Sequence, residues 1–124
     1  ESRFIEDHKV HNENYSINKS DFKEILKLKK EGYKIYAVGT TVLRTLETVI
    51  KTNIFKGTTD LYIKPGYQYE LVDYLITNFH APNSSLLSIV LSIYGEGWKE
   101  LYMYAQSKNL KFLSFGDAVL FKIT

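Results

Sequence analysis

Residues 75–90, LITNFHAPNSSLLSIV, indicate the fold more clearly than any other stretch of this chain. The first two have the apolar character of a buried strand, and three polar side chains follow them, at Thr77, Asn78 and His80. Pro82 stops a strand ladder because proline has no N–H to donate. The asparagine and serines after it favour the N-terminus of a helix. A strand that ends in polar side chains and leads into a helix is how open α/β sheets present ligand sites.

Strands and helices alternate along the rest of the chain. The patterns predict strands at 3–5, 13–17, 34–38, 61–63, 71–79, 112–115 and 118–123. They predict helices that run from a cap at Asn18 or Ser20 to Gly32, and at about 41–51, 84–94 and 96–108. No repeat or linker interrupts them, so residues 1–124 read as a single unit. We therefore predict an α/β layered domain with a largely parallel sheet flanked by helices.

Composition narrows the class of protein. With 44% apolar and 24% charged residues, the chain has the make-up of a folded globular domain rather than a disordered one. No apolar run reaches the ~20 residues that a membrane-spanning helix needs, so we expect no membrane partner. The absence of cysteine excludes disulfides and thiolate metal sites and fits the cytoplasm. A net charge of +2 leans weakly toward anionic partners.

A second motif, AVGTTVLRTLE at residues 37–47, reads as a buried strand, a tight turn and a helix start. Gly39 permits the turn, and Thr40 and Thr41 open the helix, whose free N–H groups attract phosphate or carboxylate. Arg44 could add a bidentate contact to such an anion. The alternative is an ordinary threonine-capped helix in which Arg44 pairs with Glu47 on the surface.

The remaining titratable candidates lie in HKVHNE, residues 8–13, and before the first motif. His8 and His11 with Glu13 suit hydrogen bonding or acid–base chemistry better than metal binding, because a closed metal site lacks further ligands. We therefore expect no metal. Asp73 lies in an otherwise apolar strand, where a buried carboxylate must find partners.

The motifs HKVHNE, AVGTTVLRTLE, TTDLYIKPGYQYELVD, LITNFHAPNSSLL and FLSFGDAVLF occur in this order along nearly the whole chain. In combination they resemble the C-terminal part of the S-adenosylmethionine:tRNA ribosyltransferase-isomerases of queuosine biosynthesis. The resemblance implies a two-domain enzyme, with a β-barrel inserted in an α/β domain. This chain matches only the later portion of the α/β domain, without the barrel.

The resemblance also implies a reaction. The family transfers and isomerises the ribosyl part of S-adenosylmethionine onto 7-aminomethyl-7-deazaguanine at the tRNA wobble position, which gives epoxyqueuosine. S-adenosylmethionine is then a co-substrate and tRNA the macromolecular partner. Because the sulfonium acidifies the 5′ carbon, a base near it would start the reaction, and a histidine suits that role. His80 is the first candidate, followed by His8 and His11.

Electrostatics suggests roles for the other polar residues. Asp73 or Glu13 would answer the positive sulfonium, and Arg44 with the turn at 39–41 would hold a phosphate or the methionine carboxylate. Thr77 and Asn78 would contact substrate at the strand end. Where Asn83 stands, family members usually carry a lysine, so no phosphate contact is carried over to that position.

Two other readings remain open. The chain could be a non-catalytic RNA-binding or subunit-contact module, or a different nucleotide-dependent enzyme that uses the glycine turn for phosphate. If residues 1–124 are a fragment, we expect them to be inactive alone and to self-associate through an exposed sheet edge.

Overall fold

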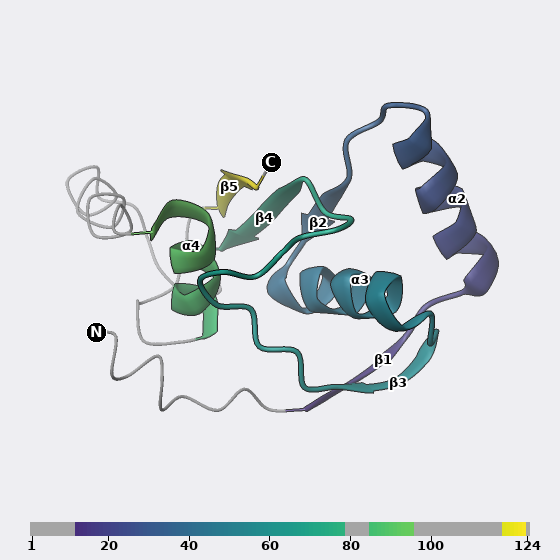
Figure 1. Ribbon diagram of the computed structural model, residues 1–124, viewed down its shortest axis with the longest axis horizontal. Coiled ribbons are helices and arrows are strands. Elements are labelled where there is room, and N and C mark those ends of the chain that lie inside the picture. Colours follow the sequence, from purple (N-terminus) through teal and green to yellow (C-terminus); the bar gives the residue numbers. More distant parts are fainter. Residues whose placement is uncertain (1–11, 79–84, 96–117, 124) are drawn as a thin grey trace.

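The computed structural model describes residues 12–78, 85–95 and 118–123 (Figure 1). The elements in chain order are β1 (Glu13–Ser16), α2 (Lys19–Lys30), β2 (Tyr36–Val38), α3 (Thr40–Thr52), β3 (Lys56–Thr59), β4 (Tyr74–Asn78), α4 (Ser85–Tyr94) and β5 (Ala118–Lys122). This mixture of helices and strands confirms the predicted α/β class. The strand predicted at 3–5, the helix at 96–108 and the strand at 112–115 lie outside the described residues.

The strands form two small sheets. One has the order β2-β4-β5, and the other consists of β1 and β3. β2 and β4 are parallel, whereas β4–β5 and β1–β3 are antiparallel. Parallel pairing needs a long crossover connection, and α3 with the loop after it supplies one between β2 and β4. Only that one of the three described pairings is parallel, so the prediction of a largely parallel sheet needs this correction.

Helix α2 begins and ends where the sequence predicted. The side chain of Asn18 accepts hydrogen bonds from the backbone N–H groups of Ser20, at 2.8 Å, and Asp21, at 3.3 Å. This cap satisfies two donors that a helix N-terminus otherwise leaves without partners. At the other end Gly32 has a φ of +102°, a backbone conformation that residues other than glycine rarely adopt.

The strand predicted at 61–63 is wrong. The pairing strand is β3, at Lys56–Thr59, where Gly57 lies opposite Tyr15 of β1. Lysine and glycine are depleted in strands, which hid this segment from the sequence patterns. The segment at 61–63 has no strand structure, although Ile63 is buried in the core.

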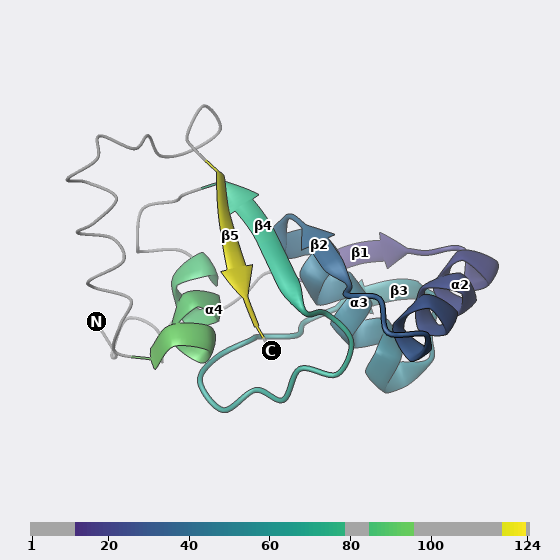
Figure 2. The ribbon, with the colours of Figure 1, turned by 90° about the horizontal axis from the view of Figure 1, so that it is seen from above.

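The hydrophobic core lies around α3. Figures 1 and 2 show this helix against the β2-β4-β5 sheet, and it also packs on β3. One face of the sheet is buried: Ala37, Leu75 and Phe121 are directly paired across the three strands and are at most 1% exposed. Burying each large side chain of this kind contributes roughly 1.5–3 kcal/mol. On the opposite face Val38 and Leu120 are more than half exposed.

Candidate functional site

The two motifs singled out in the sequence meet at one edge of the sheet. In the parallel pair, Val38 at the end of β2 lies opposite Ile76 of β4. The N–H of Gly39 donates to the carbonyl of Ile76 at 2.7 Å. The turn at 39–41 therefore lies beside the end of β4, as expected for the carboxyl ends of neighbouring parallel strands.

The start of α3 is uncapped. Gly39 occupies the N-cap with a φ of +99°, and no side chain there accepts a hydrogen bond from the helix. No acidic residue lies in the first turn of α3. The unpaired N–H groups and the helix dipole together favour a negative group at such a site. A Cβ at Gly39 would meet nothing within 4 Å, so glycine is required by its backbone conformation rather than by space.

Arg44 lies one turn into α3, and its side chain is buried. Its Nε donates to the carbonyl of Leu61 at 2.9 Å, and the guanidinium forms an ion pair with Glu13. A longer bond of 3.5 Å reaches the carbonyl of Thr59. Arg44 thus joins α3 to β1 and to the loop after β3. The surface pair with Glu47 considered as an alternative is not present among the described contacts.

Glu13 lies at the start of β1 and closes this cluster. One carboxylate oxygen pairs with Arg44, and the other accepts a hydrogen bond from the Thr41 hydroxyl at 3.1 Å. The Glu13 side chain is still 36% exposed, whereas that of Arg44 is 8% exposed. We call Glu13, Thr41 and Arg44 the Glu13 cluster. It presents a partly open carboxylate beside an uncapped helix start.

The other predicted site residues divide into two groups. Thr77 lies in β4 next to the turn at 39–41, and it is buried on the face that α3 covers. Thr40 is the first residue of α3. His8, His11 and His80 lie outside the described residues, and so does the side chain of Asn78.

Asp73 lies at the other end of β4. Its carboxylate accepts a hydrogen bond from the N–H of Ile35 at 2.9 Å and forms a salt bridge with Lys29 at 3.2 Å. Thr77 is four positions further along the chain, which in a strand is about 13 Å. The buried carboxylate of Asp73 therefore has the partners that the sequence predicted, and those partners include a backbone N–H and a lysine. These contacts hold α2, β2 and β4 together.

Glu47 is the buried carboxylate that sequence reasoning did not single out. It is fully buried, and it accepts backbone hydrogen bonds at 2.9–3.0 Å from residues 70, 71 and 72. The Tyr67 hydroxyl donates to it at 2.9 Å, and Lys51 forms a salt bridge with it at 3.4 Å. The signal was present in the helical spacing, because position 47 lies one turn after Leu43 on the inward face.

Two tyrosines near Glu47 have raised pKa values. Burial, and then the negative charge of Glu47, raise the pKa of Tyr67 well above its ordinary value. Burial raises the pKa of Tyr69 to about 12, although the hydrogen bond with Ser92 opposes this shift. Both hydroxyls therefore keep their protons to a higher pH than an ordinary tyrosine does.

Among residues 12–78, 85–95 and 118–123, no group of three histidine, cysteine, aspartate or glutamate side chains is arranged to hold a metal ion. Within the same residues, no helix has the length and apolar character that crossing a bilayer requires.

Comparison with known proteins adds a family. Residues 1–121 match the family model described as "Queuosine biosynthesis protein". An S-adenosylmethionine:tRNA ribosyltransferase-isomerase from Thermotoga petrophila is 42% identical over 120 residues, which cover 94% of this chain and 36% of that protein. The enzyme of the same name from Clostridium kluyveri is 44% identical over 123 residues, 95% of this chain and 36% of the relative.

A solved structure agrees with the fold. The crystal structure of an S-adenosylmethionine tRNA ribosyltransferase from Thermotoga maritima superposes with a TM-score of 0.78 at 39% identity. The match covers 84% of this chain and 39% of that one. The chain thus spans somewhat more than a third of the length of the proteins it matches.

Proposed function

The chain belongs to the queuosine biosynthesis protein family, and on that premise we propose that it forms part of a tRNA-modifying transferase-isomerase. The proposed reaction moves the ribosyl part of S-adenosylmethionine onto 7-aminomethyl-7-deazaguanine at the tRNA wobble position. Rearrangement of the transferred ribosyl then gives epoxyqueuosine, with release of adenine and methionine. S-adenosylmethionine is the co-substrate, tRNA is the partner, and the cytoplasm is the place of action.

The Glu13 cluster is the observation that supports a site in this part of the protein. S-adenosylmethionine carries a positive sulfonium and a negative carboxylate, so its site needs both signs of charge close together. The partly exposed carboxylate of Glu13 would attract the positive sulfonium. The uncapped start of α3 would bind the carboxylate, or a phosphate of tRNA. Arg44 holds Glu13 in place and keeps the cluster as a whole close to neutral.

We assign the proton abstraction to a histidine. A base near the 5′ carbon works best with a pKa near ambient pH, and His80 follows β4 by two residues in the sequence. His8 and His11 are the next candidates. Asp73 receives a structural role in this proposal, because Lys29 and Ile35 already hold its carboxylate at the far end of the strand.

The test uses the protein expressed from its complete gene, with S-adenosylmethionine and tRNA that carries the 7-deazaguanine precursor. We expect release of adenine and a mass increase of the wobble nucleoside. Glu13→Gln should raise the KM for S-adenosylmethionine about 10-fold, roughly the 1.4 kcal/mol expected of one charge-assisted contact.

Glu24→Gln is the matched control, because Glu24 is an exposed carboxylate on α2. It should leave the KM unchanged. Failure of the wild-type protein to release adenine, while it still binds RNA, would support the rival reading of a non-catalytic RNA-binding or subunit-contact module.

A further inference from the structure

Helix α2 carries a row of exposed lysines. Lys23, Lys27 and Lys30 follow one another at spacings of four and three residues, which places them in a row along one side of the helix. Of the exposed acidic residues, Asp21 lies on the opposite side of the helix, whereas Glu24 and Glu31 lie three and four positions from Lys27 and border the row.

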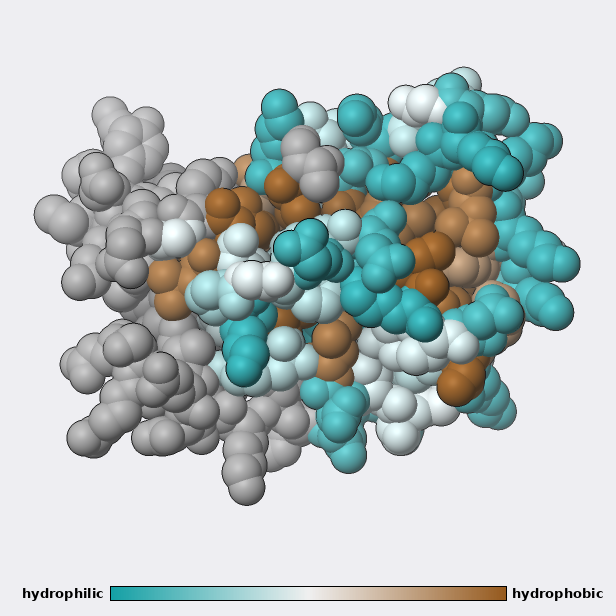
Figure 3. All heavy atoms as spheres, in the orientation of Figure 1, coloured by the Kyte–Doolittle hydropathy of each residue, from teal (hydrophilic) through white to brown (hydrophobic). Residues whose placement is uncertain are grey.

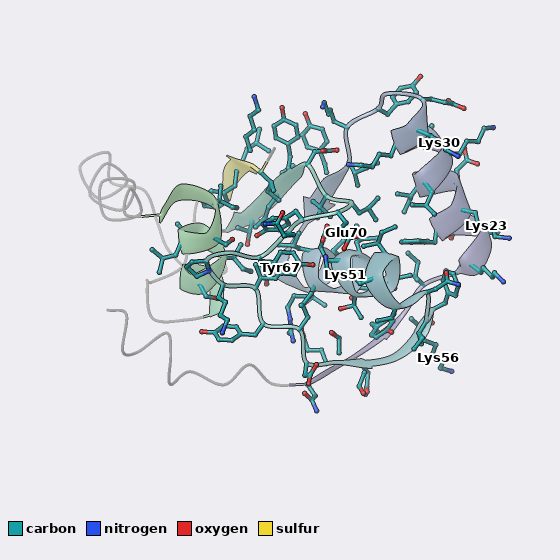
Figure 4. All side chains as sticks on the ribbon, in the orientation of Figure 1. Lys23, Lys30, Lys51, Lys56, Tyr67 and Glu70 are labelled. Atoms are coloured by element: carbon teal, nitrogen blue, oxygen red, sulfur yellow. The ribbon has the colours of Figure 1, made fainter. Side chains whose placement is uncertain are left out.

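The lysine row borders a groove. The groove has a volume of about 570 Å³ and lies between α2, the C-terminal half of α3 and residues 70 and 71, shortly before β4. Its apolar walls include Leu26, Ile50 and Leu71. Figure 3 shows apolar surface between α2 and the body of the molecule with hydrophilic surface around it, and Figure 4 shows Lys23 and Lys30 along α2. The aliphatic stems of the lysines extend this apolar lining, while their ammonium groups stay in water.

The groove carries a net positive charge. The other two charged residues that line it are already paired: Lys29 with Asp73 at 3.2 Å, and Glu70 with Lys51 at 3.0 Å. Within the described part of the chain, Lys23, Lys27 and Lys30 are exposed, and their ammonium groups have no ion pair or hydrogen bond. Lys27 and Lys30 lie in the last turn of α2, where the helix dipole also stabilises a positive charge. Lys23 lies outside that turn, so the dipole does not explain it.

We propose that this groove binds the phosphodiester backbone of tRNA away from the nucleotide that reacts. The proposal rests on the proposed function, which makes tRNA the substrate. The groove and the Glu13 cluster lie at opposite ends of α3, and the ten helical steps from Thr40 to Ile50 span about 15 Å. A tRNA extends well beyond that distance. Lysine ammonium groups bind phosphates as point charges, and an open groove with a row of them can follow a strand of phosphates.

The experiment measures tRNA binding to the complete protein over a series of salt concentrations, by fluorescence anisotropy. The triple variant K23Q/K27Q/K30Q should bind tRNA at least ~10-fold more weakly at low salt. Its plot of log affinity against log salt should be less steep by about 2, since each lost phosphate contact removes roughly 0.7–0.9. The KM for S-adenosylmethionine, and turnover at saturating tRNA, should be unchanged.

The matched control is K56Q/K64Q/K122Q, which removes three exposed lysines from other elements. It should keep most of the affinity and of the salt dependence. K23R/K27R/K30R should bind like the wild type, because it keeps the charges. If the triple glutamine variant unfolds, Lys23→Gln alone, which lies outside the last turn of α2, should reduce the salt dependence by about 1.

Two results would overturn the proposal. One is a salt dependence that is the same in the wild type and in the groove variant, or lost equally in the control. The other is that the groove variant keeps its tRNA affinity but no longer binds an acidic protein that the wild type binds. A protein segment would then be the occupant of the groove. Failure of the proposed function looks different: the wild type would then bind tRNA through these lysines but release no adenine.

Discussion

Glu13, which contacts α3 from β1, and Glu47, which belongs to α3, hold their carboxylates in opposite surroundings. Glu47 is fully buried, and three backbone N–H groups, a tyrosine and a lysine saturate its oxygens. Glu13 has two partners, Arg44 and Thr41, and stays 36% exposed beside an uncapped helix start. A buried carboxylate with every lone pair used is scaffold, whereas a half-open one can still accept a ligand.

The neighbouring residues of α3 extend this contrast. Arg44 and Glu47 are three apart, so they could have paired with each other on the helix surface. Instead Arg44 bonds to β1 and to the loop after β3, and Glu47 bonds to the segment before β4. The N-terminal half of α3 therefore borders the candidate site, and the C-terminal half holds the long loop of the crossover in place.

The largest effect should come from Glu47→Ala. The change leaves three backbone N–H groups and the Tyr67 hydroxyl without their acceptor in the interior, at a cost of ~1–3 kcal/mol for each donor that water cannot reach. We expect the free energy of unfolding to fall by about 3–5 kcal/mol, measured by urea denaturation of the complete protein. Glu24→Ala is the control and should change it by less than ~0.5 kcal/mol. A small loss for Glu47→Ala would remove the distinction between the two carboxylates.

The second effect concerns the proposed chemical step. His80→Ala should lower the turnover of the complete enzyme ~100-fold or more, the usual range for loss of a general acid or base. The melting temperature should be nearly kept. If activity survives while the melting temperature falls, His80 is structural, and the base is to be sought at His8 or His11.

Arg44→Ala lies between the two cases because Arg44 is both buried and next to the site. It should weaken binding of S-adenosylmethionine or tRNA by at least ~1.5 kcal/mol, since Glu13 loses its charged partner. Stability should fall as well, because the carbonyl of Leu61 loses a donor. Calorimetric titration with each substrate separates these effects. Unchanged dissociation constants with reduced stability would make Arg44 part of the scaffold alone.

The smallest effect is a pH dependence of the scaffold near Glu47. The pKa of Tyr69 is raised from 10.0 to about 12 in the folded state, so the unfolded chain releases its proton first as the pH rises. This contribution to stability is fully present below pH 10 and is lost between about pH 10 and 12. The melting temperature of the wild type should therefore fall more steeply with pH over this range than that of Tyr69→Phe. Parallel pH curves for the two proteins would contradict the raised pKa.

The sequence alone determined the local elements that make up the fold. Periodicity located α2, α3 and α4, and cap chemistry located the start of α2 at Asn18. The glycine turn at 39 and the polar end of β4 were also readable, because strand ends and helix starts depend on neighbouring residues. The strand patterns missed β3, where lysine and glycine replace the usual strand residues. They also started β4 too early, at 71, because the N–H groups of residues 71 and 72 donate to Glu47.

Only the tertiary structure decided which charges meet. Glu13 and Arg44 are 31 residues apart, and Lys29 and Asp73 are 44 apart, so no local pattern links them. The sequence offered Asp73 and Glu13 as alternatives for one role, and in the structure the first carboxylate is buried and the second is partly exposed. A carboxylate takes its role from the donors that folding brings to it, and those donors come from distant segments whose positions only the packed core determines.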